Sequence, residues 1–429
     1  MSNKTVIPFG DPLAMSIQAA GLMASNFQRH TVFSKLTGAM PNDVEWATNS
    51  LKLQTSVHKP IVRSIDLGKN MGDEVKFHLL QPSKAKPIMG DRKAEGRGSR
   101  LAMTGDRLRV NQARFPVDLG GVMTNIRSPY DLHKLGKPVA QNLMERYVDQ
   151  TIQVQLAGAR GFQENINWVV PLDTDPDFAE IMVNPVRPPT ANRHFMADGT
   201  NGIQAFTVNA GEVDLATTDQ LRMATIDGLR SWQDNAVLPL PGVILEGDNG
   251  VSAESPMQVF LATPAQYNGF VQDPNFRQFQ AAAMARASKS NNHPLFTSEA
   301  GLWGNILILK LARPIRFYAG DPIEYFDGAG AIQTANVPAA FGNNFAVDRG
   351  ILLGGQSMAE AFGRSHLSGI PFFWNEEQLD HKNALEVMIG TIRGVSKIQY
   401  DVNVAPGVYE ETDNGVAVVD SVVPIIGRN

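Results

Sequence analysis

The sequence predicts an α+β protein built from more than one lobe, and three observations lead to that prediction. The chain has 429 residues, 43% of them hydrophobic, so it exceeds one usual compact domain and can bury a large core. Residues 138–157 have the apolar spacing of a long amphipathic helix. Alternating or continuous apolar runs, such as 74–80 and 384–404, are instead typical of strands.

Composition excludes several classes of protein. The chain contains no cysteine, which removes disulfide frameworks, thiolate metal sites and cysteine nucleophiles. Its formal net charge is -5, so the chain as a whole is not built to coat DNA or an anionic membrane. No run approaches the roughly 20 apolar residues of a membrane span, and the first residues lack the pattern of a secretion signal. We therefore expect a soluble protein with no membrane partner.

The N-terminal residues 5–58 predict an arm. They contain one short helical candidate, residues 14–27, within extended polar sequence that has few large apolar side chains. Such a segment is poorly suited to closing a core of its own.

Residues 61–80 and 108–117 predict the two strands of a long hairpin. In the first strand, Val75, Phe77 and Leu79 alternate with polar neighbours after a Gly-Asp turn. The region between the strands is rich in glycine and in basic side chains, as expected of a flexible tip. These basic residues are Arg92, Lys93, Arg97, Arg100, Arg107 and Arg109.

The strongest helix signal follows the hairpin. Ser128 can cap this helix and Pro129 suits its first turn, while Pro138 either restarts the helix or kinks it. Beyond that proline, apolar residues recur at every fourth position until Gly158, which gives a rod of about 30 Å. The row consists of Ala140, Met144, Val148, Ile152 and Leu156.

The rest of the chain combines irregular and regular stretches. Residues 161–212 are rich in Asn, Asp and Pro and predict a long connection or an insertion. The expected elements that follow are helix 217–235, strand 258–262, helices 264–270 and 276–286, strand 305–311, a helix near 357–362, and strands 384–395, 397–404 and 416–426.

The one candidate for a catalytic nucleophile has a simpler structural explanation. Residues 355–359, Gly-Gln-Ser-Met-Ala, approximate the nucleophile elbow of an α/β hydrolase around Ser357, but the last position is not Gly. Asp380 and His381 are adjacent in the sequence, which is a poor arrangement for the other two members of a catalytic triad. A helix start packed near a strand accounts better for Ser357, and we expect no enzyme activity.

No cofactor or metal site is expected either. Asp173, Asp175 and Asp177 resemble the start of a calcium loop, but Phe178 and Asn184 occupy the positions that need a Gly and a bidentate Glu. The histidines are scattered, and no phosphate-binding or dinucleotide-binding motif follows a strand.

The basic stretch 90–110 has two functional interpretations besides that of a plain solvated loop. A nucleic-acid-binding protein would interleave aromatic residues for stacking or place base-reading arginines on a helix, and this stretch has neither. A hairpin tip that meets carboxylates on a neighbouring copy needs only flexibility and charge. We prefer this second interpretation. The candidate acidic contacts are Glu145, Asp149, Glu376 and Glu377.

Short stretches in one consistent order between residues 72 and 400 add a resemblance to a known family. They are GDEVKFHL at 72–79, GD at 90–91, EG at 95–96, LAGARG at 156–161, HPLFTSEAGLWGNILI at 293–308, RGILLGGQ at 349–356, WNEEQLDHKNALEV at 374–387 and IRGVSKIQY at 392–400. With the order of the predicted elements, they resemble the major capsid protein of a tailed bacteriophage with the Hong Kong 97-like fold. More narrowly, they resemble the coat-protein family that includes those of Enquatrovirus-like podophages.

The resemblance implies a division of the chain and a function without an active site. The parts would be an N-terminal arm at 1–55, an extended hairpin loop at 56–118, a peripheral domain with a spine helix at 119–241, an axial α/β domain at 242–363, and C-terminal strands that return to the peripheral domain at 364–429. Hairpin and arm would lie over adjacent subunits in a shell of hexamers and pentamers. An isolated two-stranded hairpin is marginal in water, so such contacts would stabilise it.

The resemblance also implies partners and a location. The shell would assemble in the cytoplasm of the host bacterium and become part of the virion, around double-stranded DNA held without sequence readout. A portal protein is implied, and a decoration protein is a further possible partner. Because few residues precede the hairpin, we expect a separate scaffolding protein.

Overall fold

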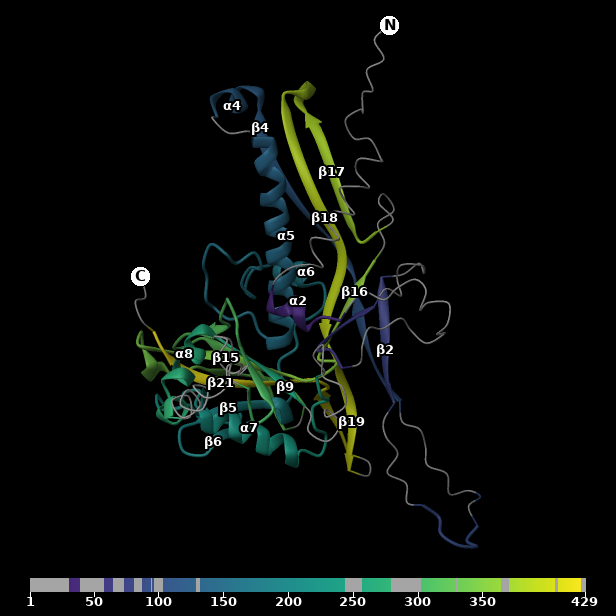
Figure 1. Cartoon of the computed structure of the whole chain (residues 1–429), viewed down its shortest axis with the longest axis vertical. Coiled ribbons are helices and arrows are strands. Elements are labelled where there is room, and N and C mark those ends of the chain that lie inside the picture. The colour runs from purple at the N-terminus through teal and green to yellow at the C-terminus, as the bar shows by residue number, and fades with distance from the viewer. Residues whose placement is uncertain are drawn as a thin grey trace, which may run out of the picture.

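A long arm of strands and one helix rises from a broader lobe in the computed structural model (Figure 1). A hairpin leads away from the lobe in the opposite direction. The structure describes residues 31–38, 58–64, 73–80, 87–93, 95, 103–128, 132–243, 257–278, 302–328, 330–363, 370–405 and 408–425.

The axis of the arm is helix α5, Leu132–Ala157, which confirms the long helix predicted from the sequence. Pro138 lies inside this helix and does not end it. The chain leaves the helix at Gly158, whose φ of 65° is a left-handed value that favours glycine. All members of the predicted apolar row are buried, namely Ala140, Met144, Val148, Ile152 and Leu156.

The predicted start of this helix at Ser128 and Pro129 stays a prediction, because residues 129–131 lie outside the described residues. Ser128 is the C-cap residue of a separate short helix, α4 (Val122–Arg127), which was not expected. Gly121 is the N-cap of α4, because the strand before it ends on two glycines. α4 lies at the far end of the arm (Figure 1).

Five strands form the sheet of the arm: β1 (Ile61–Ser64), β4 (Asn111–Gly121), β16 (Met358–Phe362), β17 (Phe372–Leu379) and β18 (Ala384–Lys397). β4 and β17 pair antiparallel with the same stretch of β18, so they flank it on its two sides. β16 pairs with the C-terminal end of β18, and β1 adds to β16 in parallel. The helix α5 packs against β4 and β18.

The helix predicted near residues 357–362 is wrong, because strand β16 occupies these positions. All five residues of β16 are buried between β1 and β18. A short apolar run that is buried on both faces has no period of its own, so its partners decide between helix and strand.

A hairpin is present as β2 (Glu74–Leu80) and β3 (Met103–Arg109), which confirms its first strand in part. The predicted second strand, 108–117, is wrong, because most of it belongs to β4 and the strand that pairs with β2 ends at Arg109. Glu74 pairs with Arg109 at its base and Leu80 with Met103 at the end of the paired segment. β1 before the hairpin and β4 after it pair instead with strands of the arm. Val110 separates β3 from β4, and its amide donates to the Asp73 carbonyl at 2.8 Å.

The lobe is built on an eight-stranded sheet that runs β10-β11-β9-β15-β21-β5-β6, with β12 beside β15. Its strands are β5 (His194–Asp198), β6 (Gly202–Ala205), β9 (Gln258–Ala262), β10 (Leu302–Trp303), β11 (Ile306–Lys310), β12 (Arg316–Phe317), β15 (Phe345–Leu353) and β21 (Val416–Pro424).

Different elements cover the two faces of this sheet. Helices α7 (Met223–Asn235) and α8 (Pro264–Gln272) cover one face, where Phe270 of α8 packs in one cluster with Phe260 of β9. The opposite face packs against the C-terminal end of α5, including Leu156. Arm and lobe therefore share a continuous apolar core.

Most predicted elements of the lobe and the C-terminal region are confirmed. The strands at 258–262, 305–311, 384–395, 397–404 and 416–426 and the helix at 264–270 are present within a few residues of their predicted bounds. Helix α7 begins at Met223, later than the predicted residue 217. The helix predicted at 14–27 and residues 279–286 of the helix predicted at 276–286 lie outside the described residues.

Two features of the organisation of the chain were not predicted. Residues 161–212, predicted as a long connection or an insertion, contain β5 and β6, which extend the lobe sheet beside β21. The C-terminal strand β21 pairs with β15 and β5 in the lobe, so it does not return to the sheet of the arm. β5 escaped prediction because its first four residues are all buried and show no alternation.

Part of the predicted N-terminal arm belongs to the body of its own subunit. Helix α2 (Val32–Leu36) buries Phe33 and Leu36 in the core that contains the end of α5. Thr37 makes an isolated parallel bridge to Ile61 of β1. Two well-placed apolar side chains are enough to fix this segment, although its overall composition is polar.

The remaining elements are small. β13 (Pro322–Phe326), β14 (Ile332–Asn336), β8 (Glu212–Val213) and β7 (Val208–Asn209) form a four-stranded sheet, and β19 (Gln399–Ala405) pairs with β20 (Val408–Asp413). Short helices are α6 (Phe178–Met182), η2 (Ala191–Arg193), η4 (Ala339–Phe341) and η5 (Asp380–Lys382). Among the described residues, no helix is long and apolar enough to cross a membrane.

Candidate assembly interface

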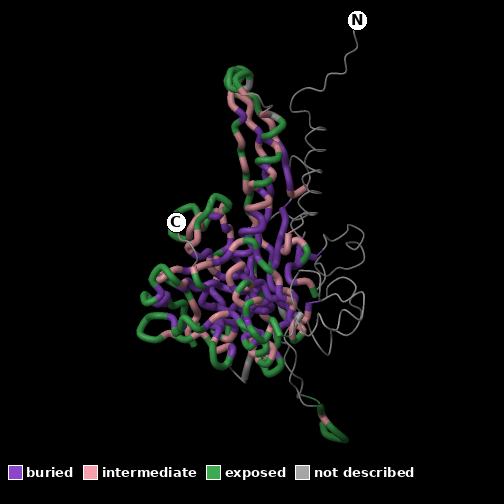
Figure 2. The backbone as a smooth tube through the Cα atoms, turned by 60° about the vertical axis from the view of Figure 1, so that its left-hand side comes forward, coloured by how far each residue is buried: buried purple, intermediate pink, exposed green. Residues whose placement is uncertain are grey.

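The described tip of the basic hairpin, residues 87–93 and 95, is mostly exposed and lies away from the body (Figure 2). Arg92 and Lys93 are exposed at its tip. Lys93 Nζ lies 2.7 Å from Glu95 Oε2, but both side chains are more than three-quarters exposed, so this ion pair contributes little stability. Arg107 and Arg109 are exposed on β3. The predicted contacts Arg97 and Arg100 lie outside the described residues.

The candidate carboxylates lie at two places on the arm. Glu376 and Glu377 are on β17, toward the end of the arm that is remote from the hairpin tip (Figure 1). Glu376 accepts a hydrogen bond from Trp374 Nε1 at 2.9 Å, and Glu377 is exposed. Because tip and carboxylates are at opposite ends of one copy, the tip does not reach Glu376 or Glu377 of its own copy.

Of the two candidate carboxylates on α5, one remains suitable for contact with another copy. Glu145 is half-buried and accepts a hydrogen bond from Gln141 at 3.2 Å. Asp149 is buried and accepts a hydrogen bond from Thr31 Oγ1 at 3.4 Å. The expectation that Asp149 meets another copy is therefore wrong, because the segment around α2 covers it.

Apolar side chains are also exposed at the far end of the arm, which we call the apolar tip. Its members lie on α4 and on the first turns of α5, and all are about half exposed or more. They are Val122, Met123, Ile126, Leu135 and Val139. Exposed apolar side chains that gather at one end of a molecule are typical of an interaction surface.

Ser357 is not a nucleophile. It is fully buried, and its hydroxyl lies 2.8 Å from the carbonyl of Gly354 and 2.7 Å from that of Gly415. Its hydrogen is therefore directed to main-chain oxygens at the junction of β15 and β16, where no substrate reaches it. The hydrolase interpretation fails at this residue.

A buried ionic cluster joins the lobe sheet to the end of α5. Arg349 of β15 binds Asp420 of β21 in a two-point contact of 2.8 and 2.9 Å, and it donates to the Ala157 carbonyl at 3.1 Å. His194 of β5 lies 2.8 Å from Asp420 and stacks on Phe206. Burial opposes ionisation of Asp420, but the charge and hydrogen bonds of Arg349 and His194 hold the pKa of this carboxyl well below its usual range.

The same cluster predicts that acid destabilises the subunit. Burial lowers the pKa of His194 to about 4 from its usual value of 6.5, against the opposing effect of Asp420. The unfolded chain therefore binds a proton below pH 6.5 that the folded chain accepts only near pH 4. The free energy of unfolding should therefore fall as the pH decreases from 6.5 to 4, and protonation of His194 should account for up to about 1.4 kcal/mol per pH unit.

Denaturant unfolding of wild type and His194→Gln at several pH values between 4 and 6.5 checks this prediction. Glutamine keeps a donor near Asp420 but does not titrate, so the variant should show a flatter pH dependence in this window. An unchanged slope in the variant would assign the acid sensitivity to other groups.

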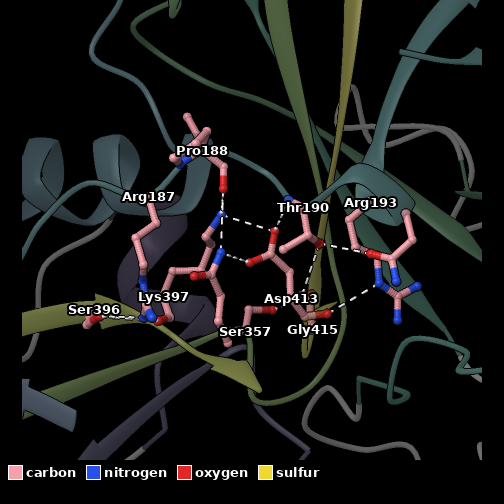
Figure 3. A network of polar contacts seen from close by, with 12 residues as sticks. Arg187, Pro188, Thr190, Arg193, Ser357, Ser396, Lys397, Asp413 and Gly415 are labelled. Carbon is pink, nitrogen blue, oxygen red and sulfur yellow. Dashed lines mark hydrogen bonds and ion pairs between the residues drawn. The ribbon is translucent and has the colours of Figure 1, made fainter. Parts of the chain in front are cut away.

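Sequence analysis missed a second buried polar cluster at the base of the hairpin (Figure 3). Lys397 is fully buried, and its Nζ lies 3.0 Å from Asp413 Oδ2 and donates to the Pro188 carbonyl at 3.1 Å. Burial lowers the pKa of Lys397, and the charge of Asp413 opposes that shift. The only sequence signal was the run Asn-Pro-Val-Arg-Pro-Pro at 184–189, which indicated a connection and named no partner.

Comparisons with known proteins agree with this architecture. The family model for phage capsid proteins matches residues 6–425. A chain from the capsid of Ralstonia phage GP4 is similar along the full length of both chains, with 22% identity and a TM-score of 0.64. A chain from the cyanophage Pam1 capsid is 16% identical with a TM-score of 0.56, over 85% of this chain and 90% of that one.

A third solved structure, the head of Helicobacter pylori bacteriophage KHP40, has a chain that is 12% identical with a TM-score of 0.55, over 92% of this chain and 93% of that one. No curated protein sequence matches the chain. At these identities the structural likenesses establish the fold, and they confirm the predicted Hong Kong 97-like α+β architecture. Since the family match extends over almost every residue, the chain belongs to the phage capsid protein family as a major capsid protein.

Proposed function

We propose that copies of this chain assemble into the icosahedral shell of a tailed bacteriophage by laying the basic hairpin of each copy across a neighbour. One observation carries this proposal: the described tip of the hairpin is exposed on all sides, and Glu376 and Glu377 of the same copy lie at the other end of the molecule (Figures 1 and 2). A repeated contact of this kind, donated by each copy and accepted by the next, closes a surface.

The same proposal assigns a position in the shell to each part of the chain. The lobe sheet with α7 and α8 would gather around the axes of hexamers and pentamers, and the arm with α5 would form the peripheral part of each subunit. The apolar tip would be covered by other subunits, because its exposed side chains are unfavourable in water. The subunit would act as a structural protein without catalysis or a cofactor.

The proposal extends to other components and to the place of assembly. Shells would form in the bacterial cytoplasm on a separate scaffolding protein, carry a portal, and hold double-stranded DNA by confinement. Binding of a decoration protein is compatible with this arrangement. Expression of the chain with and without the other head proteins, followed by electron microscopy, tests which of them assembly requires.

Charge reversal at the hairpin tests the proposed contact. The triple variant Arg92→Glu, Lys93→Glu and Arg107→Glu should reduce shell yield at least tenfold, because the reversed charges repel the carboxylates of the neighbour. All three side chains are exposed, so the thermal unfolding midpoint of the free subunit should change little. Shells are counted by sedimentation and negative-stain microscopy.

A matched variant separates charge from position. Arg92→Lys with Arg107→Lys keeps both charges at the same sites, and it should assemble at nearly the yield of the wild type. Normal shell yield in the charge-reversed variant would show that these residues do not carry the contact between copies.

A further inference from the structure

The base of the hairpin is held by directed polar contacts that the proposed shell contact does not use. Asp106 of β3 accepts a hydrogen bond from Arg187 Nη2 at 2.7 Å and another from the Gln399 amide at 3.1 Å. Both charged side chains are largely shielded from solvent, at 13% and 23% exposure. Arg187 also donates to the Lys397 carbonyl at 2.6 Å. One guanidinium thus joins β3 to the junction of β18 and β19.

Asn184 makes a second directed contact on the same strand. Its side-chain amide accepts from the Arg109 amide and donates to the Arg109 carbonyl, both at 2.9 Å, so it pairs with the main chain as a neighbouring strand would. The same amide group donates to the Val395 carbonyl of β18 at 3.0 Å. The main-chain carbonyl of Asn184 accepts a hydrogen bond from the side chain of Gln155, on α5, at 2.9 Å.

The segment that carries Asn184 and Arg187 is anchored in turn at its other end. Thr190 exchanges two hydrogen bonds of 3.2 Å with Asp413 of β20, one from each main-chain amide. Arg193 donates to the Asp413 carbonyl at 3.3 Å and to the Leu238 carbonyl at 2.7 Å. Residues 184–193 therefore connect the hairpin, the spine helix, the β19-β20 pair and the lobe. Figure 3 shows the contacts from Arg187 to Arg193 with Lys397 and Asp413.

Apolar contacts supply attraction at the same place but little direction. Val75 and Leu108, at the base of the hairpin, are buried in one cluster with Ile398 and Tyr400. Apolar burial is non-directional, whereas hydrogen bonds and ion pairs have strict distances and angles. The polar contacts of residues 184–193 therefore supply a directionality that the apolar cluster lacks.

We propose that residues 184–193 form a clamp that sets the direction of the hairpin, with Asp106 and Arg187 as its positioning pair. This inference builds on the proposed shell function, because a hairpin that projects at a fixed angle meets the next copy without a search. Residues 184–193 lie within 161–212, which the sequence predicted only as a long connection or an insertion, and the clamp gives this segment a role in assembly. A hairpin held only by apolar contacts would sample many directions and would assemble slowly or irregularly.

Hydrogen exchange measured on the full chain tests the clamp. In Asp106→Asn and in Arg187→Met, main-chain amides of β2 and β3 should exchange at least fivefold faster than in the wild type, while amides of β15 and β21 keep their rates. Shell formation should slow by a similar or larger factor. The Asn side chain in Asp106→Asn has the shape of Asp and keeps an oxygen that accepts from the Gln399 amide. This variant therefore loses mainly the ion pair with Arg187.

A surface ion pair provides the control. Arg230 and Asp234 pair at 3.0 Å on α7, with Asp234 more than half exposed. Asp234→Asn should change neither hairpin exchange nor shell formation. Arg187→Lys, which keeps the charge but not the two-armed geometry, should recover only part of the wild-type protection.

The outcomes separate this inference from the proposed function. Unchanged hairpin exchange in both clamp variants would overturn the clamp, and so would faster exchange that extends equally to β15 and β21. If the variants behave as expected but the wild-type chain forms no shells with its head proteins, the clamp stands as a property of the subunit and the proposed shell contact fails.

Discussion

Replacing Arg349 with methionine should lower the free energy of unfolding by about 3 to 5 kcal/mol, the usual effect of removing one partner of a buried ion pair. Arg349 is completely buried, and its guanidinium neutralises Asp420 through two hydrogen bonds. Methionine fits the volume and the contact with the Phe317 ring, but it leaves the Asp420 carboxylate without its guanidinium partner and with His194 alone beside it. It also removes the donor to the carbonyl of Ala157 at the end of α5. Lobe and spine helix should both lose stability.

The measurement is denaturant unfolding of the free subunit at neutral pH. The double variant Arg349→Met with Asp420→Asn is the control, since replacing both charges leaves no unpaired ion, and it should recover a substantial part of the loss. If the double variant is as unstable as the single one, the loss comes from packing and not from the buried charge.

The variant Gly394→Ala should destabilise the junction of arm and hairpin by about 3 kcal/mol, as an overpacked site does when the main chain must move. A Cβ on Gly394 would overlap the carbonyl oxygen of Arg109 and lie 2.9 Å from its carbonyl carbon. Arg109 cannot withdraw easily, because Asn184 binds both its amide and its carbonyl. The clash would push β18 away from the chain between β3 and β4.

Gly328→Ala is the matched control, because no atom lies within 4 Å of a Cβ at this exposed position. It should change the free energy of unfolding by less than about 0.5 kcal/mol. Unfolding midpoints of both variants check the pair of predictions, and a Gly394 variant as stable as the control would contradict the close approach of β18 to Arg109.

Local pattern was sufficient for the elements with a clear period. The apolar row of α5 repeats at helical spacing, and each of its members is buried as predicted. Val75, Phe77 and Leu79 alternate in β2, which pairs with β3 as a hairpin. In both cases the signal lies within a few residues of chain, so no distant partner is needed to recognise it.

The sequence pattern did not predict the elements whose conformation depends on pairing with a distant strand. Residues 358–362 form a strand because β1 and β18 pair with them, and residues 194–198 form a strand because β21 does. Val416–Pro424 was recognised as a strand, but its neighbours in the lobe were not. Strand pairing joins residues far apart in sequence, so the choice of sheet is not written in any one segment.

The functional surface divides in the same way. The basic hairpin was visible as a local excess of charge, and the structure places Arg92, Lys93, Arg107 and Arg109 on exposed positions. Asp149 was a plausible acidic contact until α2 was found to cover it. The clamp had no usable signal, because Asp106 and Arg187 are 81 residues apart and each is an ordinary charged residue by itself.

Local sequence was therefore enough to predict the long helix, a basic hairpin, several strands and the family of the chain, since each depends on local periodicity or on the order of short stretches. The sheet that each strand joins, the charges that are buried in pairs and the contacts that hold the base of the hairpin became known from the folded structure alone. These features depend on contacts between distant segments, and such contacts exist only once the whole chain has folded.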